Sequence, residues 1–305
     1  MIFPFFTFIP LILLALRRII ILIKMVYELS NMAWWEAEEK IRKSKVAIVP
    51  VGATEQHGLH IGVGADWIQA WEIAKRVGEK SDALVLPVLT YGVSGHHSEF
   101  QGTITLDEPT YQEVIYQILS NLNRMKIRKV VFINGHGGNT NSIVAALKRS
   151  RESFGMVGSI IEWWTVWSDR TIFGQKFEAH AGYTETAFML ASRPEAVKME
   201  YAVLSPTKQF DKDIEIIRAG LAKFDGGVVW LPLKTGDVSD TGSMTEAHPS
   251  EAAGTRDYSK ITREFSVNLM NEYVDWICSF LKKFEAMNVP PINVSKERAF
   301  KQLKD

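Results

Sequence analysis

The stretch VAIVPVGATEQHGLHIGVGAD, residues 46–66, decides how this chain is interpreted, because a buried strand runs directly into a group of polar side chains. It begins with an apolar, largely β-branched run, which predicts a buried strand. Glu55 and His57 follow that run, and Asp66 ends the stretch. Polar residues at the carboxyl ends of buried strands lie where open α/β sheets place their chemistry.

A second stretch, VVFINGHGGN at residues 130–139, repeats this order of strand and polar loop and places His136 in the loop. Gly135, Gly137 and Gly138 surround that histidine. Glycine removes side-chain bulk where main chain closely approaches an ion or a substrate. The sequence therefore favours a binding role for His136 over ordinary packing.

Imidazole and carboxylate groups together predict a site for zinc, manganese or ferrous iron. Thiolate ligands are excluded because the single cysteine, Cys278, lies in a late helical stretch. Glu55 and His57 are two residues apart, so in an extended segment they leave the same face and can reach one centre or two adjacent ones. The Asp66 carboxylate could bridge two ions.

Each of these residues also has a structural interpretation. Glu55 could be a solvated loop carboxylate, and Asp66 could cap the helix expected at residues 67–80. His136 could be a loop histidine whose hydrogen bonds are satisfied locally.

The pattern along the chain predicts the architecture. Strands are expected at 46–52, 83–89, 129–135 and 158–164, and helices at 32–44 (capped by Ser30 or Asn31), 67–80, 110–125, 141–153, 184–192 and 258–287. This alternation predicts an α/β fold, a three-layer α/β/α sandwich with a mainly parallel sheet. Residues 203–254 are interpreted as strand and glycine-rich loop that caps the site or serves assembly.

Four motifs together resemble the creatininase family of metal-dependent amidohydrolases, over about residues 26–255. They are, in the family's order, VPVGATEQHGLHIGVGAD, YGVSGHHSEFQGTITL, INGHGGNTNSI and HAGYTETAFML. The resemblance implies a pair of divalent ions, zinc first and manganese or ferrous iron as alternatives. It assigns them to Glu55, His57, Asp66 and His136, with the aspartate bridging.

The chain departs from creatininase itself at one ligand position. Creatininase has a further carboxylate ligand where this chain has Gly138, which leaves creatinine specificity open. The matching candidate for that carboxylate is Glu185, in HAGYTET.

The resemblance places a proton-transfer group at His180, and a histidine pKa near neutrality suits that task. The alternative role for His180 is helix-end capping. Glu178 is a second candidate acid or base, although an exposed loop carboxylate is the commoner fate.

The loop at residues 91–106 is expected to line a substrate pocket. His97 matches a histidine that is frequent in the family, and Ser94, Gly102 and Thr103 could donate hydrogen bonds to a polar substrate. His96 has no family counterpart, so surface exposure is expected.

Trp163, Trp164 and Trp167 follow a strand-like run and could close over a small planar substrate. Burial in the core or at a subunit interface is the alternative.

Composition limits the remaining possibilities. The 305 residues are 46% hydrophobic, which is enough for one sizeable core, and 35 basic residues balance 35 acidic ones. Nucleic-acid binding is therefore not expected. A single cysteine permits no internal disulfide, and a cytoplasmic location is expected. The resemblance implies a homo-oligomer, commonly a hexamer.

We divide the chain into an apolar appendage or over-extended start (1–24), a hydrolase domain (25–288) and a polar tail (289–305). The apolar stretch is broken by Pro4, Pro10 and an arginine pair, so a clean membrane span is not expected.

The expected function is hydrolysis, in which water activated by the ions opens a small polar molecule, with a cyclic amide as the leading substrate. Ring opening of a carbocyclic ketone from sugar or inositol breakdown, or formamide hydrolysis, would use the same chemistry. A noncatalytic metal-binding scaffold is the alternative from another class.

Overall fold

A four-stranded parallel sheet forms the centre of the computed structural model, which describes residues 27–166, 180–244 and 258–289. Its strand order is β2-β1-β3-β4. The strands are β1 (Val46–Val51), β2 (Leu84–Val85), β3 (Lys129–Asn134) and β4 (Val157–Ile161). The central strands β1 and β3 pair along their whole lengths, so their carboxyl ends stop side by side.

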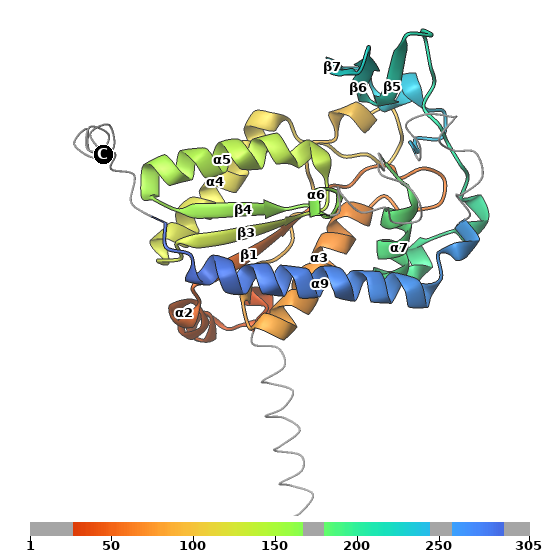
Figure 1. Cartoon of the computed structure of the whole chain (residues 1–305). Coiled ribbons are helices and arrows are strands. Elements are labelled where there is room, and N and C mark those ends of the chain that lie inside the picture. Colours follow the sequence, from red (N-terminus) through yellow and green to blue (C-terminus); the bar gives the residue numbers. More distant parts are fainter. Residues whose placement is uncertain (1–26, 167–179, 245–257, 290–305) are drawn as a thin grey trace, which may run out of the picture.

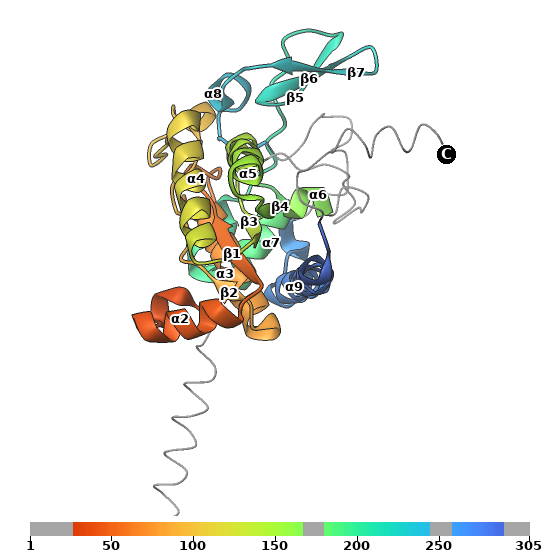
Figure 2. The ribbon, with the colours of Figure 1, turned by 90° about the vertical axis from the view of Figure 1, so that its left-hand side faces the viewer.

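Helices cover both faces of this sheet (Figures 1 and 2). One face carries α3 (Ala65–Ser81), α7 (Tyr183–Ser192) and α9 (Arg263–Ala286), and the other carries α4 (Glu108–Arg124) and α5 (Thr140–Phe154). Val46 and Ile48 pack toward the first group, whereas Ala47 and Val49 pack toward the second, as the two-residue period of a strand requires. The predicted α/β/α sandwich is confirmed.

Two predicted strands are shorter than expected. The run at 83–89 forms only the two-residue strand β2, and Pro87 within that run has no N–H to donate to a ladder. The run at 158–164 ends as strand at Ile161, opposite Ile133, near the end of β3. The next residues, Trp163–Val166, form the helical turn α6.

Two predicted helices start later than expected. α2 (Trp34–Lys43) does not begin after Ser30 or Asn31, because the Glu36 carboxylate accepts the backbone N–H of Ala33 at 2.8 Å and fixes the start there.

The C-terminal helix α9 begins after Thr262, whose hydroxyl accepts the backbone N–H of Phe265 at 3.1 Å. Tyr258–Lys260 forms a separate 3₁₀ turn. No helix among the described residues is both long and apolar enough to cross a membrane. Residues 1–24 and all but the first residue of the tail at 289–305 lie outside the described residues.

A second, antiparallel sheet lies beyond the carboxyl end of the first (Figure 1). Its strands are β5 (Ile214–Arg218), β6 (Gly220–Phe224) and β7 (Gly227–Leu231), followed by the short helix α8 (Thr235–Val238). Asp225 and Gly226 join β6 to β7 with φ values of 44° and 76°. An Asp-Gly pair with positive φ is the strongest short hairpin signal, and the sequence prediction overlooked it.

Two glycines let helix α3 start directly against the central strands. A Cβ at Gly52, just after β1, would overlap the backbone of Asp66 and Trp67. A Cβ at Gly135, just after β3, would overlap the backbone carbonyl of Asp66. Asp66 is therefore held where β1 and β3 end because neither strand carries a side chain at this point.

We expect Gly135→Ala to push α3 away from the strands. Overpacking of this kind typically costs about 2 kcal/mol of the free energy of unfolding, which urea denaturation would measure. Gly137→Ala is the matched control, because among the described residues no atom beyond its own chain neighbours lies within 4 Å of the added Cβ. Equal stability of the two variants would contradict the proposed contact.

Candidate metal centre

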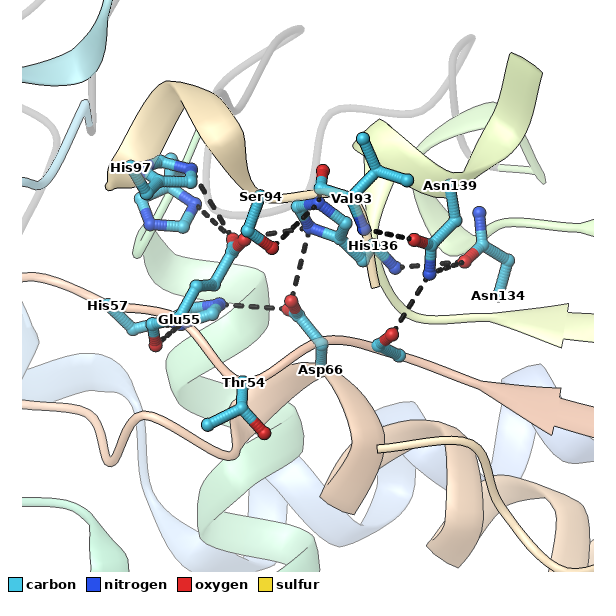
Figure 3. Close-up of polar contacts among 12 residues, drawn as sticks. Thr54, Glu55, His57, Asp66, Val93, Ser94, His97, Asn134, His136 and Asn139 are labelled. Carbon is cyan, nitrogen blue, oxygen red and sulfur yellow. Dashed lines mark hydrogen bonds and ion pairs between the residues drawn. The ribbon is translucent and has the colours of Figure 1, made fainter. Parts of the chain in front are cut away.

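Segments far apart in the sequence meet at the carboxyl ends of β1 and β3 (Figure 3). Glu55 and His57 come from the loop after β1, Asp66 from the first turn of α3, and His136 from the loop after β3. Each of these four residues is at most 4% exposed. Buried charges must be paired or bound to an ion, so the negative charges of Glu55 and Asp66 need positive charges within the cluster.

The Asp66 carboxylate lies between two imidazoles. Its Oδ1 is 2.9 Å from His57 Nε2, and its Oδ2 is 3.2 Å from His136 Nδ1. Helix α3 begins at Ala65 with Gly64 in the cap position, and no side chain makes a cap hydrogen bond. The alternative interpretation of Asp66 as a helix cap is therefore wrong.

The Glu55 carboxylate lies at the centre of the cluster. Its Oε1 is 3.2 Å from His136 Nδ1, 3.3 Å from His97 Nε2 and 3.8 Å from His180 Nδ1. Because Glu55 is only 1% exposed, the interpretation as a solvated loop carboxylate is wrong.

The pKa shifts in the cluster follow from burial and opposite charge. Burial opposes ionisation of Glu55, but the charge of His136 helps to outweigh it, and the pKa of Glu55 stays well below its usual range. The pKa of Asp66 is lowered in the same way, against burial, chiefly by His57. Burial would lower the pKa of His57, yet the carboxylates, Asp66 first, raise it to about 10. The pKa of His136 is likewise raised, by Glu55 first, against burial. Protons on imidazoles thus balance the buried carboxylates.

The outer ring nitrogens of both histidines face backbone carbonyls. His57 Nδ1 is 3.1 Å from the carbonyl oxygen of Glu55, and His136 Nε2 is 2.9 Å from that of Val93. A carbonyl only accepts, so these outer nitrogens carry hydrogen. Metal-binding histidines typically donate their other ring N–H to a carbonyl or carboxylate in this way. The inner nitrogens of His57 and His136 can then act as ligands when the rings are neutral.

Helix α7 brings two further residues to the cluster. His180 precedes the helix and is fixed by backbone hydrogen bonds to Met244 in both directions. Glu185 lies buried in the first turn, where its Oε2 accepts the backbone N–H of Ala181 at 2.5 Å. One potential ligand atom from each of His57, His180 and Glu185 lies within 4.8 Å of the others. The structure thus brings His180 and all five predicted metal-binding residues together.

Gly138 has no room for a side chain. A Cβ at this position would overlap the carbonyl oxygen of Val93 and the ring of His136. A carboxylate following His136 at this position could therefore not fit this backbone, whereas Glu185 reaches the cluster from α7.

The loop residues predicted to bind substrate lie close to the cluster. The buried Ser94 has its hydroxyl 3.4 Å from His136 Nε2, and His97 contacts Glu55. Thr103 Oγ1 accepts the backbone N–H of Gln56 at 3.1 Å. Gly102 occupies a turn with a φ of 92°.

The tryptophans are placed differently. Trp163 is buried in the core, edge-on against Trp164 at 5.3 Å and Phe188 at 6.2 Å between ring centroids. The structure thus favours the core-packing alternative for Trp163, while Trp164 is partly buried beside it. Trp167 and Glu178 lie outside the described residues.

The expectation that His96 is exposed is wrong. Its half-buried ring stacks on His136 at 5.8 Å between centroids and lies 4.1 Å from the ring of His97. Burial lowers its pKa to about 4. The loop at 91–106 folds over the cluster, which sequence alone did not show.

Asn139 is a further residue that sequence reasoning missed. Its side chain donates to the carbonyl of Gly52 at 3.0 Å and accepts the backbone N–H of Val93 at 3.0 Å. Asn139 thus connects the loop that follows β1 with the loop that contains Val93. Its position at the end of the GHGGN run was the sequence feature that could have indicated this role.

Known proteins share sequence motifs and the fold with this chain. A family model described as creatininase, creatinine amidohydrolase, matches residues 30–280. Creatinine amidohydrolase of Pseudomonas putida is 30% identical over 201 residues, covering 59% of this chain and 77% of that protein. Mycofactocin precursor peptide peptidase of Mycolicibacterium smegmatis is 30% identical over 181 residues, covering 57% and 69%. The 3-dehydro-scyllo-inosose hydrolase of Thermotoga maritima is 24% identical over 287 residues, covering 90% of each chain.

Solved structures share the fold. A crystal structure of creatinine amidohydrolase superposes with a TM-score of 0.68 at 24% identity, covering 86% of this chain and 99% of that one. A structure of creatininase with Mn superposes with a TM-score of 0.64 at 25% identity, covering 84% and 98%. Since the family model spans most of the sequence and the fold is the same, this chain belongs to the creatininase family of hydrolases.

Proposed function

We propose that this hydrolase uses two divalent ions to open an amide C–N bond in a small polar molecule, with cyclic amides as the leading substrates. The observation that carries the proposal is the Asp66 carboxylate, whose two oxygens face the inner nitrogens of two different histidines. A carboxylate in this position can bridge two ions that replace the protons of those histidines.

The donor set fits such ions. Among the described residues, neither Glu55 oxygen nor Asp66 Oδ2 has a hydrogen bond of good geometry, although all three are buried and imidazole nitrogens lie 3.2 to 3.3 Å from Glu55 Oε1 and Asp66 Oδ2. Buried carboxylate oxygens without well-formed hydrogen bonds are costly, and a bound cation would remove that cost. Nitrogen and oxygen ligands without thiolate suit zinc, which we expect first, and also manganese or ferrous iron.

We assign the ligands to two groups that share the Asp66 carboxylate. Glu55, Asp66 and His136 would hold one ion, because His136 Nδ1 lies 3.2 Å from both carboxylates, and His57, Asp66 and Glu185 would hold the other. Ions bound there would lower the pKa of water to about 7 and polarise a carbonyl oxygen.

His180 is the proposed proton acceptor. Its Nε2 donates to the carbonyl oxygen of Gln56 at 2.8 Å, so its Nδ1 carries a lone pair that faces the cluster. Burial, reinforced by the charge of His57, lowers the pKa of His180 to about 3 and keeps the ring neutral. We assign His180 Nδ1 as the group that would take the proton of an attacking water and pass it to the leaving nitrogen, because its lone pair faces the cluster. A pKa of about 3 lies below the near-neutral value expected from the sequence, so the assignment rests on this geometry and not on the pKa.

Ring opening of a carbocyclic ketone is the second candidate. The inosose hydrolase relative covers 90% of each chain, more than the amide-cleaving relatives do. Formamide hydrolysis needs the same groups. A noncatalytic scaffold is disfavoured by membership of a hydrolase family and by the neutral His180 facing the cluster.

We also propose a cytoplasmic homo-oligomer with residues 25–288 as its catalytic domain. The single cysteine makes the fold independent of an oxidising compartment. Every residue of β7 is exposed, including Val228 and Trp230, and such an apolar edge strand is suited to a subunit contact.

We expect elemental analysis to find about two ions per chain, as in two-metal hydrolases, and Asp66→Asn to lose most of both, because the bridging charge is removed. Asp240→Asn, at an exposed carboxylate paired with Lys208, is the control and should retain them. Full metal content in Asp66→Asn would exclude the bridged centre.

Metal affinity should rise with pH. In the metal-free protein the raised pKa values of His57 and His136 keep both rings protonated at pH 7, and binding must displace those protons. Zinc titration by calorimetry in two buffers of different ionisation enthalpy measures the protons released. Binding without proton release would contradict this ligand assignment.

His180→Gln should retain its ions but lose turnover by a factor of about 10² to 10⁴, the usual contribution of acid-base catalysis. The assay is a screen of cyclic amides and carbocyclic ketones with metal-loaded enzyme, and the class that is turned over decides between the two candidate reactions. Unchanged turnover in the variant would remove His180 from the mechanism.

A further inference from the structure

The histidines around Glu55 differ in what holds their outer ring nitrogen. For His57, His136 and His180 the partner is a backbone carbonyl, at 3.1, 2.9 and 2.8 Å. These rings therefore turn an unprotonated nitrogen toward the carboxylates whenever they are neutral.

His97 has the opposite environment. Its outer nitrogen, Nδ1, lies 2.8 Å from Gln56 Nε2 and 2.9 Å from Thr235 Oγ1. The Gln56 amide is held in one orientation, because its Oε1 accepts the backbone N–H of Gly58 at 2.9 Å and its Nε2 donates to the carbonyl of Gly242 at 3.0 Å. The second N–H of Gln56 is therefore left for His97 Nδ1, which must accept it.

This contact fixes the hydrogen of His97 on its inner nitrogen. Nδ1 cannot carry hydrogen, because N–H would then face N–H of Gln56, and a doubly protonated ring is excluded for the same reason. The neutral ring carries its hydrogen on Nε2, 3.3 Å from Glu55 Oε1. Burial of His97 agrees with a neutral ring, because it holds the pKa well below its usual value.

We propose that Gln56 is a positioning residue that sets opposite tautomers on the two histidines beside it. Its backbone carbonyl accepts the outer N–H of His180, so the inner nitrogen of His180 carries a lone pair. Its side-chain amide donates to the outer nitrogen of His97, so the inner nitrogen of His97 carries the hydrogen.

His97 is consequently not a metal ligand, although one of its ring nitrogens lies within 4.8 Å of potential ligand atoms of Glu55 and His180. Its role in turnover rests on the proposed function: the N–H faces Glu55 Oε1 and would hold that carboxylate in place. The tautomers themselves do not depend on the reaction.

Left-handed glycines make room for this arrangement. A Cβ at Gly242 (φ 82°) would overlap Gln56 Oε1, and a Cβ at Gly58 (φ 61°) would overlap Ser243 Oγ. The segment that follows the second sheet thus packs directly on Gln56. Residues that follow the second sheet thus contact both partners of the pair, Gly242 at Gln56 and Thr235 at His97.

The test is ¹⁵N NMR of the full chain with labelled histidine, first metal-free and then with zinc alone. His97 is identified by the signals that His97→Gln removes. We expect a pyrrole-type Nε2 and a pyridine-type Nδ1, unchanged by zinc. A hydrogen on Nδ1, or loss of the Nε2 hydrogen when zinc binds, would overturn the proposal.

Three variants test the role of the Gln56 amide. Gln56→Glu should move the hydrogen of His97 to Nδ1, because the new carboxylate can only accept there. Gln56→Met removes the donor to Nδ1 and leaves only Glu55 to favour the hydrogen on Nε2, so the Nδ1 tautomer should become detectable. Thr235→Val is the matched control and should leave the hydrogen on Nε2, because a hydroxyl can donate or accept and so does not select a tautomer.

An unchanged His97 spectrum in folded Gln56→Glu or Gln56→Met would remove Gln56 from this role. If Gln56→Glu fails to fold, the histidine spectra of Gln56→Met and of the wild type still test whether Gln56 sets the tautomer of His97. If the wild type binds no zinc, the proposed function fails, whereas the metal-free spectrum still tests the tautomers.

Discussion

Two carboxylates, Glu55 and Asp66, are buried where the central strands end, and the surrounding structure compensates their charge. Transferring a charged group from water into the protein interior costs several kcal/mol unless the group is paired there. The protonated imidazoles of His57 and His136, from two separate loops, provide that pairing, and divalent ions would provide it more strongly. Helix α3 also directs its N-terminus at the site, where its dipole favours the charge of Asp66.

Close backbone approach is the geometric condition for this compensation. Gly52 and Gly135 allow α3 to abut the strand ends, and Gly138 leaves space that the ring of His136 and the carbonyl of Val93 fill. The creatininase-family position that could carry a carboxylate is thereby closed in this chain. Glu185, buried in the first turn of α7, is the carboxylate that we propose in its place.

Hydrogen bonds outside the cluster decide what each histidine can do inside it. Backbone carbonyls hold three rings as potential ligands or proton acceptors, and one glutamine side chain makes His97 a donor. A ring nitrogen at ligand distance is therefore not by itself a ligand. The group bonded to the other ring nitrogen decides whether that nitrogen can be a ligand, as it does in metal sites generally.

Local patterns in the sequence determined the parallel sheet, its covering helices and the identity of Glu55, His57, Asp66 and His136, because strand runs and the loops that follow them are contiguous. His180 and Glu185 were assigned from the family resemblance and not from a local pattern. The Asp225–Gly226 hairpin was also encoded locally, although it was overlooked. The exposure of His96 and the packing of Trp163 were decided by tertiary structure. The position of the ring hydrogen of His97 was also decided by tertiary structure. The Gln56 amide that faces His97 is oriented by the carbonyl of Gly242, which lies 186 positions away in the sequence. Which nitrogen carries a proton depends on the group that faces it, and only the folded chain brings that group into contact.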